Sequence, residues 1–167
     1  RGATDDAFWG EAGDDSLSGG GGAIDEQPGS ITRLLLLVQN QQGYLNLCEL
    51  LARGWTRNVV KAQPVITWAW LTELGEGLIL LSGAQAGPLG APLLQGDSAK
   101  AAEIALQIAS IFPHRFYIEL QRAGRPEDEP HVNAAVQLAA RLGLPVVATQ
   151  PVQFLGADDY EAHEARV

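Results

Sequence analysis

Four short apolar runs, separated by stretches of helical spacing, constrain the fold of this chain more than any other feature. The runs are Leu34–Val38, Gly77–Gly83, Arg115–Gln121 and Leu144–Ala148. Each run is predicted to form a strand, and a strand that alternates with helices of about 10–15 residues is typical of an α/β fold. The pattern predicts a parallel sheet with right-handed crossovers. Four strands do not distinguish an open sheet from part of a barrel.

The last apolar run shows where a site belongs in such a fold. It follows a helical stretch that ends at Gly143, a residue type favoured just after helix C-termini. Leu144–Ala148 is continuous and bounded by turn signals, which predicts a strand buried on both faces, with Pro145 tolerated only at its start. A polar turn, residues 149–151, comes next. Sites in α/β sheets are built at this end of the strands.

The segments between the runs have helical spacing and recognisable caps. Thr67 is expected to cap a short helix ahead of Trp70, and Asp97 or Ser98 is expected to cap a longer one. Residues 57–64 are expected to form a loop. The expected helices are 44–55, one beginning near 66, 88–94, 98–112, 130–142 and a last one that begins at Asp158 or Asp159.

Charge and glycine divide the chain into two regions. The net charge is −9, and residues 1–30 carry seven of the acidic side chains against Arg1 alone. This region also contains a run of four glycines, so we expect a flexible insert or flank, with an acidic binding tail as the alternative. Residues 31–167 are expected to form the folded part. Since no basic patch is present, this part is not expected to grip nucleic acid by itself.

The cysteine content bears on the redox compartment, and the chain ends bear on whether the sequence is part of a longer chain. Cys48 is the only cysteine, so neither an internal disulfide nor a cysteine zinc cluster can form, which is compatible with a reducing cytoplasm. No signal peptide and no apolar run near 18 residues is present. The sequence opens on Arg1 and closes in a helical pattern at Ala165–Val167, so we expect a piece of a longer chain.

The residues that follow the predicted strands are poor candidates for catalysis. A hydrolytic metal site needs carboxylate, imidazole or thiolate ligands, and these positions offer none. The phosphate-binding loop, the dinucleotide-binding GxGxxG and the GxSxG nucleophile motif are also absent. The strand-end residues are Gln39, Asn40, Ser82, Ala84, Gln121, Arg122, Gln150 and Gln153.

The three histidines offer little more. His114 is expected to face solvent after a helix end, and His131 to lie on the surface in the first turn of a helix. His163 is two residues from Glu161, so the two do not share a helix face. A structural or partner-contact role for His163 is favoured over a ligand role.

Glu119 is the one carboxylate predicted to lie inside a strand. Gln121, two residues on, shares its face of the sheet. A buried, hydrogen-bonded, structural carboxylate is therefore the favoured interpretation.

Four segments of the chain carry motifs of a known family. They are LLLLVQNQQGYLNLCELL, WLTELGEGLILLSGAQAG, LLQGDSAKA and the long segment from FPHRFYIEL to the PVQFL and AHEARV ending. Together they resemble the PHP (polymerase and histidinol phosphatase) domain of bacterial replicative DNA polymerase III alpha subunits of the proteobacterial type. The resemblance runs almost without gaps from about Ile31 to Val167 and does not cover residues 1–30.

The resemblance implies part of a distorted (β/α)7 barrel, similar to a TIM barrel, whose N-terminal strands are missing here together with a His-x-His motif. Metal-binding members place a His before the first strand, a Cys after the second, and an Asp and a His after the fourth. Arg33, Ala84, Pro151 and Gln153 stand at these four positions. None of them can coordinate a metal, so no catalytic, cofactor-binding or metal residue is expected in this segment.

The resemblance also implies a function. The parent protein would be a DNA-directed DNA polymerase (a nucleotidyltransferase of DNA replication in the cytoplasm), with its magnesium site outside this segment. The segment itself would be inactive and structural, supporting the polymerase and docking the proofreading exonuclease subunit among other replicase subunits. DNA would be bound through other domains, and no membrane contact is expected. The alternatives are a residual metal-dependent phosphoesterase, using the missing histidines with Glu161 and His163, and the PHP domain of an error-prone polymerase paralogue.

Overall fold

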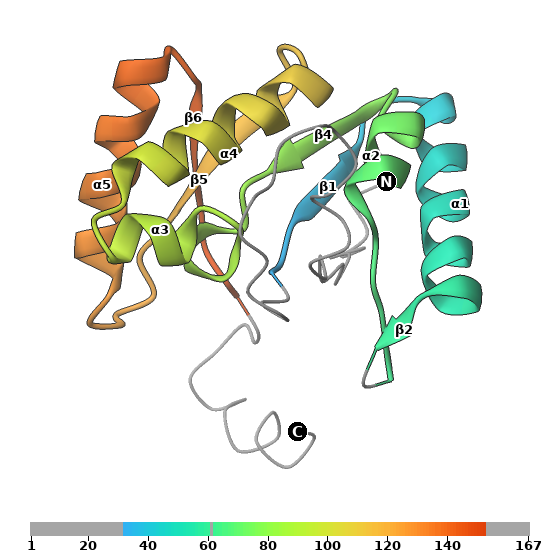
Figure 1. Cartoon of the computed structure of the whole chain (residues 1–167), viewed down its shortest axis with the longest axis horizontal. Helices are drawn as coiled ribbons and strands as arrows, with labels where there is room; N and C mark the ends of the chain where they lie inside the picture. Colours follow the sequence, from blue (N-terminus) through green and yellow to red (C-terminus); the bar gives the residue numbers. More distant parts are fainter. Residues whose placement is uncertain (1–31, 61, 153–167) are drawn as a thin grey trace.

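The computed structural model describes residues 32–60 and 62–152. The expectations for residues 1–30 and for the last helix, which includes Glu161 and His163, lie outside these ranges. The elements in chain order are β1 (Leu35–Val38), α1 (Gln41–Arg57), β2 (Val59–Val60), β3 (Gln63–Pro64), α2 (Trp68–Leu74), β4 (Leu78–Leu81), the 3₁₀ helix η2 (Ala84–Ala86), α3 (Gly90–Leu94), α4 (Ser98–Ile111), β5 (Phe116–Gln121), α5 (Asp128–Leu142) and β6 (Val146–Thr149) (Figure 1).

The sheet is mixed, not purely parallel. Its strand order is β1-β4-β5-β6, and β4, β5 and β6 run parallel as predicted. The prediction was wrong for β1, which pairs antiparallel with β4 in a register that sets Leu35 opposite Leu81 and Val38 opposite Leu78. The α/β class is therefore confirmed, with one reversed strand.

The reversal arises because two helices, not one, lie between β1 and β4. The chain leaves the sheet through α1, turns in the β2–β3 hairpin, which stands where the sequence suggested a loop, and returns through α2 (Figure 1). Arg53 of α1 holds Glu73 of α2 through two hydrogen bonds of 2.6 and 2.8 Å. The chain thus re-enters the sheet at the edge where β1 ended, where Gln39 N–H donates to Gly77 O at 2.9 Å.

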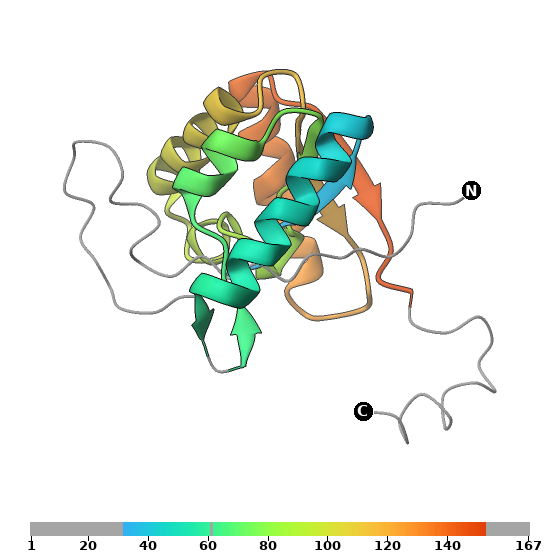
Figure 2. The same cartoon turned by 90° about the vertical axis from the view of Figure 1, so that its right-hand side faces the viewer.

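The helices gather on one side of the sheet and the strands lie on the other (Figure 2). Alternate strand residues, among them Leu36, Leu80, Phe116 and Ile118, are buried in one apolar core with the helices. The helical members of this core include Leu47, Leu50, Trp68, Leu71, Ala101, Ala105, Ile108, Ala135, Leu138 and Ala139. Burial of this continuous apolar surface is the main force that holds the helices to the sheet.

The β6 strand is less buried than its apolar sequence suggested. Val146 is 46% exposed, Ala148 is exposed, and Val147 and Thr149 are half-buried. The prediction of burial on both faces was wrong for the described residues. The reason is that β6 is the outermost strand of the sheet and pairs only with β5. Pro145 does precede the strand, and its carbonyl accepts from Ile118 N–H at 2.9 Å.

The predicted caps explain where most helices begin and end. Thr67 accepts from Trp70 N–H at 3.3 Å, and Gly143 takes the left-handed conformation (φ +67°) after α5. The first helix begins earlier than expected, at Gln41, because the Asn40 side chain accepts from Gly43 N–H at 2.9 Å. Helix α5 likewise begins two residues before the predicted start at Pro130.

Asp97 caps α4 by accepting from Lys100 N–H at 2.9 Å. Replacing Asp97 by alanine is expected to lower the free energy of unfolding by about 1 kcal/mol, since the first turn loses its side-chain acceptor. Urea denaturation measures the effect. Ser98→Ala, at the neighbouring exposed position, is the matched control and should change stability by less than about 0.5 kcal/mol. Equal losses in the two variants would contradict the capping role.

Candidate functional site

One edge of the sheet collects most of the strand-end residues. The carboxyl ends of β4, β5 and β6 meet there because these strands are parallel. The amino end of β1 joins them, since β1 runs the opposite way, and Arg33 N–H donates to Ala86 O at 2.8 Å. This candidate-site edge thus contains Arg33, residues 82–86, Gln121 and residues 149–152.

Two of the predicted strand-end residues lie elsewhere. Gln39 and Asn40 follow β1 and therefore lie at the opposite edge of the sheet, where Asn40 caps α1. Grouping them with Ser82 and Gln121 was wrong, and the cause is the reversed direction of β1. Ser82 and Ala84 after β4, Gln121 and Arg122 after β5, and Gln150 after β6 do lie at one edge, as parallel strands require.

Three of the four positions that the resemblance associates with metal ligands lie at the candidate-site edge. Arg33 precedes β1, Ala84 follows β4 and Pro151 follows β6. Ala84 is buried and has a left-handed backbone (φ +47°). Gln153 lies outside the described residues.

A hydrogen-bond network around Glu119 fills part of this edge. The side chain is 2% exposed. Its Oε2 accepts from Gly83 N–H at 3.1 Å, and its Oε1 accepts from Gln121 Nε2 at 2.8 Å and from the Thr149 hydroxyl. Its backbone N–H donates to Ser82 Oγ at 2.9 Å. The prediction of a buried, hydrogen-bonded carboxylate is confirmed, and the network links the ends of β4, β5 and β6.

Asp128 organises the loop between β5 and α5, residues 122–127. Its Oδ2 accepts from Ala123 N–H at 2.5 Å and Arg125 N–H at 3.0 Å, and its Oδ1 accepts from Gln85 Nε2 at 2.6 Å. Burial raises the pKa of Asp128, but these backbone and side-chain hydrogen bonds outweigh it and lower the pKa below its usual value. Asp128 was not among the predicted site residues, although an Asp at the start of a helix was the available signal.

The histidines divide between surface and core. His114 is exposed, as predicted, in a turn with φ +61°. His131 is 1% exposed, so its predicted surface location was wrong. Helix α5 begins at Asp128, earlier than expected, and His131 falls one turn later on the same face as this buried residue.

The donor set at the candidate-site edge does not fit a metal. Arg33 is cationic, and Ala84 and Pro151 have no side-chain donor. Both oxygens of Glu119 already accept hydrogen bonds. Within residues 32–60 and 62–152, no three His, Cys, Asp or Glu side chains gather as a ligand set. The described part of this edge can brace the strand ends through the hydrogen bonds of Glu119.

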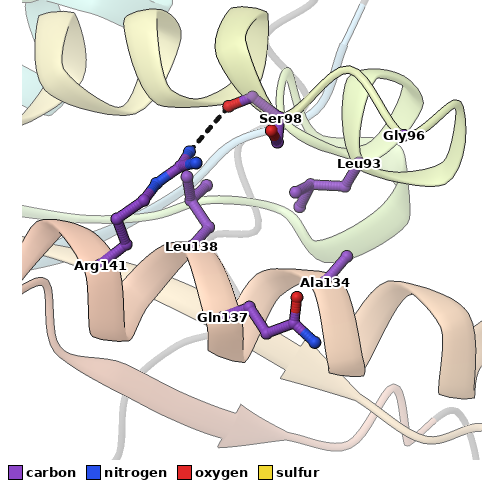
Figure 3. Close-up of a pocket in the computed structure, with 7 residues that line it drawn as sticks. All are labelled: Leu93, Gly96, Ser98, Ala134, Gln137, Leu138 and Arg141. Atoms are coloured by element: carbon purple, nitrogen blue, oxygen red, sulfur yellow. Dashed lines mark hydrogen bonds between the residues drawn. The ribbon is translucent and has the colours of Figure 1, made fainter.

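A separate groove of about 330 Å³ lies between α3, α4 and α5. Arg141 spans it by donating to Ser98 O at 2.8 Å (Figure 3). Its lining shares no residue with the candidate-site edge and consists of Leu93, Gly96, Ser98, Ala134, Gln137, Leu138 and Arg141.

Among the described residues, no helix has the length and apolar character needed to cross a bilayer.

Comparisons with known proteins identify the family of this chain. The PHP domain family matches residues 13–123, a range that begins within residues 1–30 and stops just before α5. The division of the chain at residue 31 remains a prediction.

Curated relatives carry the name DNA polymerase III subunit alpha. The Pseudomonas aeruginosa protein is 46% identical over 145 residues, which cover 87% of this chain and 12% of that protein. The Escherichia coli K12 protein is 46% identical over 137 residues (82% and 12%), and the Neisseria meningitidis serogroup A protein is 47% identical over 148 residues (85% and 13%). The chain thus spans about an eighth of the length of these relatives. The PHP domain family matches residues 13–123, which is more than half of this chain. The chain therefore belongs to the PHP domain family.

Proposed function

We propose that this chain is the PHP portion of a replicative DNA polymerase III alpha subunit, a DNA-directed DNA polymerase. The observation that carries the proposal is the identity of 42–47% with alpha subunits of several proteobacteria. Polymerisation itself, with its magnesium ions and its grip on DNA, belongs to parts of the parent protein outside this segment. The parent acts in the cytoplasm.

We further propose that the segment has a metal-free, structural role. The support is chemical, because Arg33, Ala84 and Pro151 replace the ligands that metal-binding members of the family use. The Glu119 network joins the ends of three strands by direct hydrogen bonds. No phosphoesterase step is therefore assigned to these residues.

The second face of the sheet supports a place in a larger barrel. Leu37 is 38% exposed there, and Ile79, Tyr117 and Val147 are only half-buried. A sheet with helices on one side needs cover for an apolar second face. We propose that strands outside the described residues complete a distorted (β/α)7 barrel, with this face as its inner wall.

The proposed partner is the proofreading exonuclease subunit of the same replicase, alongside other replicase subunits. The test is a calorimetric titration of the 167-residue chain with the cognate exonuclease subunit. One-to-one binding is expected, and a matched titration with an unrelated exonuclease provides the control. The docking role is excluded if a chain with a cooperative unfolding transition gives no heat and no co-elution with the subunit.

A further inference from the structure

His131 differs from the other buried residues of the described structure because its polar ring lacks hydrogen-bond partners. Its ring is 1% exposed, and within the described residues neither Nδ1 nor Nε2 has a hydrogen-bond partner. A neutral imidazole carries one donor and one acceptor, and buried polar groups in folded proteins almost always find partners. An unpaired buried imidazole is costly, which points to a role other than packing.

Two carboxylates favour the charged form of this ring. Asp128 lies one turn earlier on α5, and Glu119 lies on β5. Helix α5 also packs against η2 and α3, which carry no titratable side chain, and against α4, whose Lys100 and Glu103 are exposed. Burial lowers the pKa of His131 and outweighs the opposing effect of Asp128 and Glu119. The ring is therefore neutral in the folded protein at neutral pH.

Asp128 is the group that a charged ring would disturb. Its carboxylate holds Ala123 N–H, Arg125 N–H and Gln85 Nε2, so it ties both the β5–α5 loop and η2 to the start of α5. A protonated imidazole has two N–H donors and no acceptor. Of the two carboxylates, Asp128 has the larger electrostatic effect on the His131 ring. Neither ring nitrogen has a hydrogen-bond partner in the structure, so a bond to that carboxylate requires the ring or the carboxylate to move. Movement of the carboxylate strains the bonds that hold the loop.

We propose that His131 is a pH-sensitive latch on the β5–α5 loop, residues 122–127. While the ring is neutral, Asp128 holds the loop against the end of the sheet. Protonation makes the ring compete for Asp128, and the loop opens beside the candidate-site edge. The latch stands on the burial of the unpaired His131 ring and on the hydrogen bonds of Asp128, and it is independent of the proposed polymerase function.

The direction of the pH response follows from linkage. The open form exposes His131 to water, where its pKa is near 6.5, whereas the closed form holds the pKa below that value. The open form therefore binds more protons as the pH falls below about 6.5. With one proton involved, the ratio of open to closed loop rises by at most about tenfold for each pH unit below that point.

Hydrogen exchange on the full chain at pH 7.5, 6.5 and 5.5, corrected for intrinsic rates, tests the latch. The amides of Ala123 and Arg125 should lose protection by up to about tenfold between pH 6.5 and 5.5, while those of α4 keep theirs. His131→Phe should abolish this pH response. His114→Gln, at the exposed histidine, is the matched control and should retain it. Asp128→Asn should leave the loop open at all three pH values.

Two results would overturn the latch. The first is an unchanged pH response in His131→Phe, and the second is a loss of protection that spreads equally over α4, which indicates global unfolding. Should His131→Phe fail to fold, an NMR titration of the ring protons in the unaltered chain decides the matter. A neutral His131 ring at pH 6 supports the latch, and a midpoint near 6.5 in the folded state removes it.

Discussion

Replacing Glu119 by alanine is expected to lower the free energy of unfolding by about 3 kcal/mol. The substitution removes one acceptor from each of three donors in a part-buried setting, namely Gly83 N–H, Gln121 Nε2 and the Thr149 hydroxyl. Hydrogen bonds to a charged group contribute more than neutral ones, and an unsatisfied buried donor costs about 1–3 kcal/mol. The loss should appear as a lower urea midpoint.

Two further variants sharpen the Glu119 experiment. Glu119→Gln keeps the size of the side chain but replaces one acceptor oxygen by an NH₂ group, which cannot accept from the donors around it. The free energy of unfolding is therefore expected to fall by about 1–3 kcal/mol. Glu103→Ala removes an exposed carboxylate from α4 and should change stability by less than about 0.5 kcal/mol. If Glu119→Ala is as stable as Glu103→Ala, the network does not hold the strand ends together.

Replacing Gly43 by alanine is expected to lower the free energy of unfolding by about 3 kcal/mol, although alanine is the better helix former. Gly43 lies in the first turn of α1, where a Cβ would come within 1.9 Å of Gly77 O. That atom belongs to the backbone of the turn before β4, so relief requires the two corners to separate. In an open helix the same change would stabilise by about 1 kcal/mol, so the sign of the effect distinguishes the two situations.

Gly143→Ala is the matched comparison for Gly43→Ala. Gly143 has φ +67°, and nothing lies within 4 Å of an added Cβ. The cost there is backbone strain alone, about 1–2 kcal/mol. Thermal or urea denaturation of both variants gives the comparison. A stabilised Gly43→Ala variant would show that the β1–α1 and α2–β4 corners are not in contact.

Local sequence signals predicted most of the elements, and tertiary arrangement explains what they missed. Short apolar runs placed all four strands of the sheet, and Thr67, Asp97 and Gly143 act through contacts within a few residues, which a sequence displays. The direction of β1 depends instead on how α1, the hairpin and α2 pack between the strands. The exposure of β6 depends on its position as the outermost strand of the sheet, and an apolar run in the sequence does not reveal that position.

The candidate site was predictable to a similar extent. Glu119 was identified because a carboxylate inside an apolar strand with Gln121 on its face requires a hydrogen-bonded setting. His131 was assigned to the surface because it was expected to lie in the first turn of a helix. Its burial follows from the helical spacing, which places His131 on the same inward face as Asp128 and Ala135. The phase of the helix, and not its first residue, decides which side chains face the core.

Metal content is the most direct test of the metal-free structural role. The chain is purified after loading with Mn²⁺ or Zn²⁺, dialysed, and measured by elemental analysis beside a metal-binding PHP protein treated in the same way. The account predicts that this chain retains far less than one equivalent while the control retains its metal. Retention of one equivalent or more, together with phosphoesterase activity that a chelator abolishes, would contradict the account.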